Sequence, residues 1–239
     1  MNRKLTRMLA AVAGFCLIFG LLCTVICVGA SSRNFYYKEY EKLGVHNDIG
    51  ISMEELKEAT DVLLDYTEGK REDMVVYADI KGVNEPVFNE RETAHMYDVR
   101  NLFINVRAVG IAAIILGAVG LVLIAVFARD KKDFFKGYLY GNIAFFAIVA
   151  FIVAYAATDF TAFWTSFHHV FFTNDLWLLD PATDNLILMV PEQFFFDLVF
   201  MIVGVFVAIS AVLAAASGVS IKILKKKGLK NGVCKACRK

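Results

Sequence analysis

The sequence predicts an α-helical integral membrane protein with four transmembrane helices and a small α/β extracellular cap. Four apolar segments are each long enough to cross a bilayer, because a helix needs about twenty apolar residues to span the hydrocarbon core. The composition agrees, since 58% of residues are hydrophobic and the mean hydropathy is +0.55, which does not suit a soluble domain. Lysine and arginine gather at both ends and in one central loop, which is typical of cytoplasmic segments.

These features divide the chain into alternating membrane and aqueous parts. Each predicted span is rich in Ala, Val, Ile, Leu and Phe and nearly free of charge. The predicted parts are a cytoplasmic leader (1–7), the first span (8–30), the first cap segment (31–102), the second span (103–128), a cytoplasmic loop (129–139), the third span (140–157), the second cap segment (158–196), the fourth span (197–224) and a basic cytoplasmic tail (225–239).

The distribution of charge predicts the orientation. The leader, the loop around residues 129–139 and the stretch from Lys222 to Lys239 hold 15 of the 25 basic residues and only two acids, Asp130 and Asp133. Because cytoplasmic loops carry the excess of Lys and Arg, both termini are predicted to be cytoplasmic and both cap segments extracellular. The expected location is therefore a cytoplasmic membrane, which the chain crosses several times.

An alternative for the first span is a cleaved signal peptide, given its basic start and the small residues at positions 29–32. Its apolar stretch is longer than the roughly 7–15 residues of a signal peptide core, which favours a retained membrane anchor.

Charge and cysteine usage exclude some classes of function. The second cap segment has five acids and no Lys or Arg, which argues against nucleic acid as a partner. Neither cap segment contains cysteine, so no disulfide framework is expected there. Cys234 and Cys237 form a lone C-x-x-C pair, which is half of a typical structural zinc site and is interpreted as spare thiols.

The first cap segment carries the pattern of a small folded unit. Ser52 and Glu55 form a capping box ahead of apolar residues at helical spacing, and this helix is expected to end near Gly69. Residues 74–80 are predicted to form a strand, Lys81 and Gly82 a turn, and residues 85–88 a second strand.

A second helix start follows and carries the first candidate catalytic residue. Asn89 with Glu92 three residues later is an N-terminal helix signal. At helical spacing His95 shares a face with Asp98 and lies beside Glu92, so either carboxylate could orient its imidazole for proton transfer. The alternative is an ordinary charged surface helix leading into the second span.

The second cap segment is crowded with aromatic residues, and His168 and His169 lie among them. An aromatic belt at the membrane interface explains the enrichment, but not the two histidines. Residues 176–179 and 185–190 resemble the strands of a hairpin that could cover an aromatic pocket. All four histidines, His46 included, fall in predicted extracellular segments, which favours an enzyme, because imidazole both takes and gives protons near neutral pH.

At these two stretches the sequence resembles the bacterial lipoprotein intramolecular transacylase family, four-span membrane enzymes with an extracellular cap. The resemblance covers nearly the whole chain and implies that His95 and His168 are the catalytic pair. The shared motifs are Glu92-x-x-His95-Met-x-Asp98-Val-Arg100, then Phe167-His168-x-x-Phe171-Phe172, then Trp177 with Asp180-Pro181, Asp184 and Pro191-Glu-x-Phe194-Phe195.

The resemblance also implies the substrate and the reaction. The partners would be diacylglyceryl-modified bacterial lipoproteins and membrane lipid. The sn-2 acyl chain would move to the α-amine of the lipidated N-terminal cysteine and give a lyso-form lipoprotein, with no cofactor and no metal.

Roles for the site residues follow from that chemistry. His168, in an aromatic setting that disfavours its charged form, is the expected base, although the order could be reversed. His95 is expected to donate a proton to the alkoxide or to steady the intermediate. Arg100 or a backbone amide is the candidate for stabilising the oxyanion. The residues expected to bind or orient the substrate are Glu92, Asp98, Arg100, Phe167, Phe171, Phe172, Trp177 and Phe195.

Two other functions fit the same residues. A metal-dependent membrane hydrolase would use His95, His168, His169 and Asp98 as ligands, although no H-E-x-x-H sequence occurs. A non-catalytic membrane sensor or assembly factor would use the cap to bind a partner.

Overall fold

The computed structural model describes residues 1–128 and 130–213, and the predictions made for the basic tail and for Cys234 and Cys237 lie outside these residues. Within them, four helices are long and apolar enough to cross a membrane. They are α1 (Arg3–Ala30), α5 (Glu90–Phe127), α6 (Lys131–Thr158) and a fourth helix over Glu192–Leu213. The predicted fold class, four spans with a small α/β cap, is confirmed.

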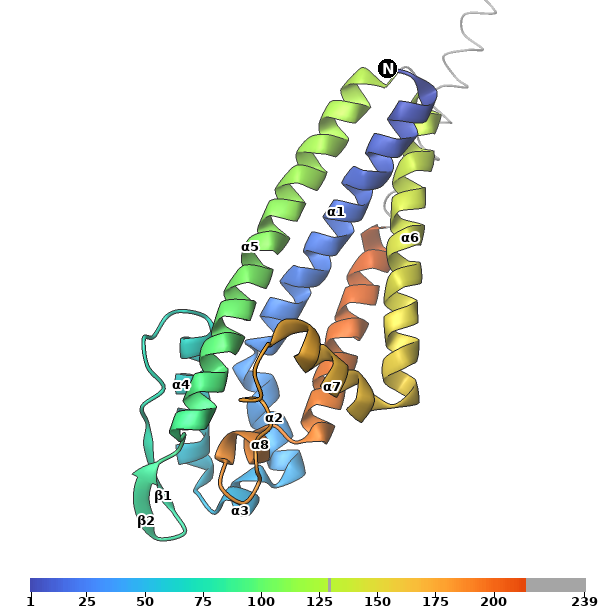
Figure 1. The fold of residues 1–239 in the computed structure, drawn as a ribbon. Coiled ribbons are helices and arrows are strands. Elements are labelled where there is room, and N and C mark those ends of the chain that lie inside the picture. The colour runs from blue at the N-terminus through green and yellow to red at the C-terminus, as the bar shows by residue number, and fades with distance from the viewer. Residues whose placement is uncertain (129, 214–239) are drawn as a thin grey trace, which may run out of the picture.

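Helix α1 lies at the centre of the bundle and packs against α5 on one side and α6 on the other (Figure 1). Small residues allow this close approach: a Cβ at Gly20 would lie 2.6 Å from the carbonyl oxygen of Gly110 in α5. Gly141 in α6 meets the backbone of Ala11 in the same way. Glycine contacts of this kind are a usual way for membrane helices to pack, because lipid offers no hydrophobic drive for association.

Helix α5 is much longer than a membrane span. Its 38 residues give a length of about 57 Å, against about 30 Å for the hydrocarbon core. It begins at Glu90, well before the predicted start of the second span at residue 103, and its first turns form part of the cap (Figure 1). One continuous helix therefore fixes the position of His95 relative to the membrane bundle.

The cap consists of short helices and one hairpin. Helices α2 (Arg33–Leu43), α3 (Val45–Ile49) and α4 (Met53–Thr67) precede strands β1 (Tyr77–Ile80) and β2 (Val83–Pro86). The capping box of Ser52 and Glu55 forms as predicted. Strand β1 is shorter than the predicted strand over residues 74–80, and β2 lies two residues earlier than the predicted strand over residues 85–88. The turn at Lys81 and Gly82 has only two residues, both with positive φ, so β2 begins directly after it.

The cap also receives residues from the second cap segment. Helix α7 (Phe160–Phe171) follows α6, and α8 (Asn185–Met189) packs against α3. The predicted hairpin over residues 176–179 and 185–190 is wrong, because residues 185–189 are helical. The N–H of Leu186 in its first turn donates to the Glu92 carboxylate of α5, so a side chain satisfies it and no partner strand is needed.

Candidate active site

The structure brings His95 and His168 together from the two cap segments. His95 lies on the second turn of α5 and His168 on the last turn of α7, which runs from the end of α6 toward α5 (Figure 1). Their ring centroids are 6.1 Å apart, and the residues are only 7% and 5% exposed. Two buried imidazoles therefore lie close together where the two cap segments meet.

His168 is held by aromatic rings and one backbone hydrogen bond. Its ring stacks on Trp177 at 4.6 Å and meets the edge of Trp164 at 4.8 Å. Its Nδ1 lies 2.8 Å from the carbonyl oxygen of Trp164, and because a carbonyl only accepts, Nδ1 carries the proton. Nε2 of the neutral ring is then left with a free lone pair. Burial lowers the pKa of His168, which favours this neutral form.

His95 has fewer polar contacts. Its Nδ1 is buried without a hydrogen-bond partner among the described residues, and Phe172 meets the ring at 5.4 Å. Burial, and then the neighbouring His168, lower the pKa of His95 to about 4, while Asp98 opposes the shift. Both imidazoles are therefore neutral at neutral pH.

The sequence had suggested that Glu92 could orient His95. In the structure its carboxylate instead joins the two cap segments. It is 1% exposed, and its Oε2 accepts the N–H of Asn89 in a capping box while its Oε1 accepts the N–H of Leu186. Next to it, Nδ2 of Asn89 donates to Oδ1 of Asp184 at 2.7 Å. This cross-link holds the second cap segment against the start of α5, one turn from His95.

Two further contacts hold the loop that follows α7. Oδ2 of Asp98 accepts Nδ2 of Asn174 at 2.9 Å, and Arg91 donates to the carbonyl oxygen of Asp175. Arg91 and Asp98 lie on the same face of α5 as His95, one turn to either side of it. They position the loop that delivers Trp177 to His168.

Arg100 lies away from the histidine pair. Its guanidinium stands over the ring of Tyr66 at 4.8 Å and approaches Glu72 at 3.8 Å, on the side of α5 that faces α4. The structure therefore does not bring Arg100 to the histidine pair, because five residues along a helix turn a side chain about 140° from His95.

The aromatic residues selected from the sequence gather around His168. Phe167 meets its ring at 5.6 Å, Phe171 packs on Phe167 at 4.8 Å and is half exposed, and Phe195 packs on Trp164 at 4.3 Å. The indole Nε1 of Trp177 is buried without a partner among the described residues. An unpaired buried donor of this kind is costly and is suited to a bound substrate.

Two residues of the site were not expected from the sequence. Trp164 supplies the carbonyl that fixes the His168 tautomer, and Arg91 holds the loop after α7. Each lies four residues before a catalytic candidate, so helical spacing alone was the available signal. His169 meets Trp177 edge-on at 5.3 Å, whereas His46 lies in α3 within the cap.

The fold and site define a multi-pass membrane protein with two buried imidazoles in an aromatic pocket beneath a small cap. The sequence model of the lipoprotein intramolecular transacylase Lit family matches residues 11–195, and the chain therefore belongs to that family. It is a transacylase, a kind of acyltransferase, and the family name implies lipoprotein substrates.

Solved structures of the membrane integral lipoprotein intramolecular transacylase Lit from Bacillus cereus share this fold. One aligns with a TM-score of 0.76 at 21% identity and covers 95% of this chain and 100% of that chain. A variant with a histidine replaced by arginine aligns with a TM-score of 0.73 at 21% identity over 95% of each chain. An alanine variant aligns at 0.69 and 21% identity over 88% of this chain and 90% of that chain. No curated protein matches the chain.

The cross-link through Glu92 gives a direct prediction. Glu92→Gln should lower the free energy of unfolding by about 1–3 kcal/mol, because an amide NH₂ replaces one carboxylate oxygen and leaves a buried backbone N–H unpaired. Turnover should fall with it, since the separation of His95 and His168 depends on the same contact. Thermal unfolding in detergent and transacylase turnover measure the two effects.

The matched control is Glu90→Gln, an exposed position in the first turn of the same helix. It removes the same charge without touching the second cap segment. Equal stability and turnover in the two variants would contradict the structural role of Glu92.

Proposed function

We propose that the chain moves the sn-2 acyl chain of a lipoprotein's diacylglyceryl group to the α-amine of the same lipidated N-terminal cysteine, which yields the lyso-form. The observation that carries this proposal is the buried pair of neutral imidazoles, 6.1 Å apart, at the junction of membrane bundle and cap. Family membership supplies the reaction class, and the residues of the pair suit the finer chemistry.

The reaction transfers a proton from one atom to another but neither consumes nor releases a proton overall. The amine nitrogen attacks the acyl carbonyl carbon, a C–N bond forms, and the ester C–O bond to the glyceryl group breaks. The proton lost by the amine ends on the glyceryl oxygen. The cyclic transition state contains eight atoms, which a flexible substrate rarely forms, so a confined pocket that holds it folded would accelerate the step.

His168 is the base in this proposal. Its Nδ1–H is engaged by the Trp164 carbonyl, so Nε2 is the atom that takes the proton from the attacking amine. Trp177 stacked on the ring and burial around it keep the neutral form populated. A positioned base of this kind typically contributes about 10²–10⁴ in rate.

His95 acts as a neutral hydrogen-bond donor rather than as an imidazolium. With its pKa lowered to about 4, it carries no charge at neutral pH, and its N–H steadies the glyceryl alkoxide as the ester bond breaks. The protonated His168 then returns the proton to that oxygen. This assignment keeps His168 as the base and gives His95 a stabilising hydrogen bond in place of proton donation.

The indole N–H of Trp177 replaces Arg100 as the candidate for stabilising the oxyanion. It is a buried donor without a partner among the described residues and belongs to the ring stacked on His168. A donor of this type, already in place before the reaction, stabilises charge as it develops on the acyl carbonyl.

A cavity of about 230 Å³ beside the pair is the proposed route from the membrane. Asp98, Asn101 and Asn105 line it on α5, and residues 171–174 line the other side. Phe172 contacts both histidine rings, so this cavity adjoins the reaction centre. Its amide side chains suit glyceryl esters, while the exposed Phe171 suits acyl chains.

The charge distribution supports the topology. Arg3, Arg7 and Asp133 form ion pairs at the end of the bundle opposite to the cap, next to the basic loop and leader. We place this end in the cytoplasm, so that the cap and the site face outward and the spans keep the boundaries expected from the sequence.

The two alternatives receive less support. Among residues 1–128 and 130–213, no three His, Cys, Asp or Glu side chains converge closely enough to hold a metal, so the proposed ligands of a hydrolase are not assembled there. A non-catalytic sensor gives no reason for the unpaired polar atoms of His95 and Trp177 beside His168.

Replacement of the histidines tests the catalytic pair. His168→Gln and His95→Gln should each lower turnover about 10²–10⁴-fold while the protein keeps its thermal stability within a few degrees, because glutamine retains a polar side chain of similar length. His169→Gln is the matched control, since its side chain is exposed, unlike that of His168, and meets Trp177 only edge-on. Wild-type turnover in the His168 variant would overturn the mechanism.

An isotope experiment tests the function itself. Diacylglyceryl lipopeptide with labelled acyl chains is mixed with an unlabelled one of different peptide mass, and enzyme and chelator are added. Mass spectrometry should find that each N-acylated peptide keeps its own label, because the acyl chain moves within one molecule. Scrambled labels would indicate an acyl-enzyme or an intermolecular route, and activity that only zinc restores would favour the hydrolase-like site.

A further inference from the structure

The outer edge of strand β2 offers unpaired backbone groups. In the register of the hairpin, Ile80 lies opposite Val83 across the turn, and Asp79 lies opposite Asn84. Farther from the turn, the N–H of Val87 donates to the carbonyl oxygen of Val76. Because hydrogen-bonded and non-bonded pairs alternate in an antiparallel ladder, the N–H and C=O of Asn84 point away from β1. Among the described residues none bonds to them, whereas the free edge of β1 is satisfied at Asp79 by Glu55.

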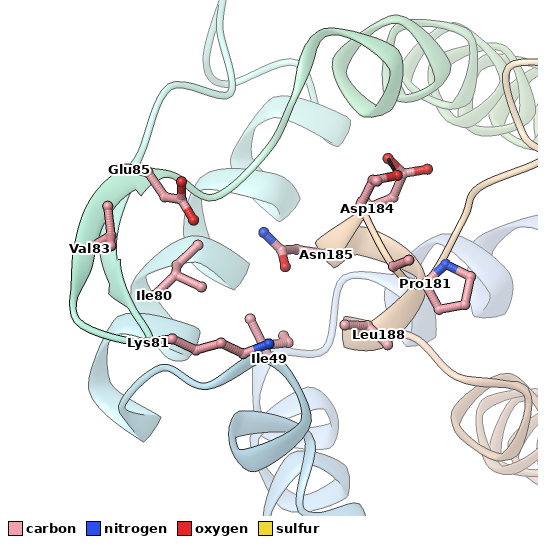
Figure 2. A pocket seen from close by; sticks show the side chains of 11 residues that line it. Ile49, Ile80, Lys81, Val83, Glu85, Pro181, Asp184, Asn185 and Leu188 are labelled. Atoms are coloured by element: carbon pink, nitrogen blue, oxygen red, sulfur yellow. Dashed lines mark hydrogen bonds between the residues drawn. The ribbon is translucent and has the colours of Figure 1, made fainter.

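A cavity of about 300 Å³ lies beside this edge. Val83 and Glu85 share the inner face of the hairpin with the buried Ala78 and Ile80, yet both are exposed, because they line the cavity and are not covered by the core. Figure 2 shows them on one side of the space and the loop of residues 181–185 on the other. At the end of β2, Nδ2 of Asn185 donates to the carbonyl of Val87 and closes the groove.

We propose that the peptide segment following the acylated cysteine of the lipoprotein binds here, as an added strand on β2. The proposal rests on the proposed function, since it names where the polypeptide part of that substrate lies. Extended peptides commonly bind by pairing with a free sheet edge, where backbone hydrogen bonds give affinity and alternate side chains enter pockets. The cavity beneath β2 would receive the alternate side chains.

The position of the groove fits a chain that leaves the histidine pair. From His95 to Asn89 is about 9 Å along α5, at about 1.5 Å per residue. Asn89 bonds directly to Asp184, which lines the groove. An extended peptide covers roughly 3.3 Å per residue, so about three to five residues reach the groove from a cysteine held at His95. The hairpin lies beside the start of α5, at the end of the molecule opposite to the N-terminus, in the direction that a tethered protein must leave the membrane (Figure 1).

Two substrates and two variants test the groove. The purified protein is assayed with a diacylglyceryl lipopeptide carrying a ten-residue tail and with a diacylglyceryl dipeptide that cannot reach β2. Wild type should show a KM about three- to tenfold lower for the long substrate, with equal kcat, because one or two backbone hydrogen bonds form only there. Asn84→Pro removes the outward N–H without removing a bond to β1, so it should raise the long-substrate KM to the short-substrate value.

Asn84→Ala is the matched control, because it keeps the backbone N–H and loses only the side chain. It should behave as wild type with both substrates, and Asn84→Pro should be unchanged with the dipeptide. Equal KM values for the two substrates in the wild type, or the same KM rise in both variants, would overturn the proposal.

Backbone methylation of the substrate provides a second measurement that leaves the protein intact. N-methylation of single residues three to seven after the cysteine should raise KM at alternate positions, since a strand turns every second N–H toward its neighbour. A rise at no position, or at every position equally, would contradict strand pairing. Absence of N-acylated product from both substrates would instead count against the proposed function.

Discussion

The structure depends on the cross-link between its two cap segments at the start of α5. The carboxylate of Glu92 accepts one backbone N–H from its own helix cap and one from Leu186, which is distant in sequence, and Asn89 adds a bond to Asp184. Charge-assisted hydrogen bonds between buried groups are strong, and their loss leaves donors unpaired. Because His95 lies one turn from this cross-link and His168 belongs to the segment that it holds, the same contacts keep the two histidines together.

Burial is the second constraint, and it determines the charge of the pair. A protonated imidazole is costly in an apolar pocket, and two protonated rings 6.1 Å apart repel one another, so both stay neutral. Direct attack by an amine requires a neutral base, because the base must accept the proton that the amine loses. In the proposed function the same aromatic rings that lower the pKa values would also confine the substrate, so that packing and catalysis would rest on the same side chains.

Local sequence patterns predicted the elements better than their contacts. The apolar runs predicted the four spans, and both the capping box of Ser52 with Glu55 and the helix start at Asn89 formed as predicted, because both depend on residues three apart. The helix at residues 185–189 was missed, because its first N–H is satisfied by Glu92 from another segment. The position of Arg100 away from the histidine pair could not be predicted, because a motif does not say which face of a helix meets the site. The pairing of His95 with His168 depended on the family resemblance, since nothing local brings residues 73 apart together.

The pH dependence of turnover tests the central claim, that two neutral imidazoles carry out the transfer. Both histidine pKa values are lowered, that of His95 to about 4, so both rings are neutral above the ordinary imidazole pKa of about 6.5 and take up protons only at lower pH. Over the alkaline range the rate should rise until the substrate α-amine, with a pKa of about 8, is deprotonated, and then stay level. Below about pH 6 the profile should steepen as the histidines take up protons. A rate that falls between pH 6.5 and 8 would show that an imidazolium is required and would contradict the account.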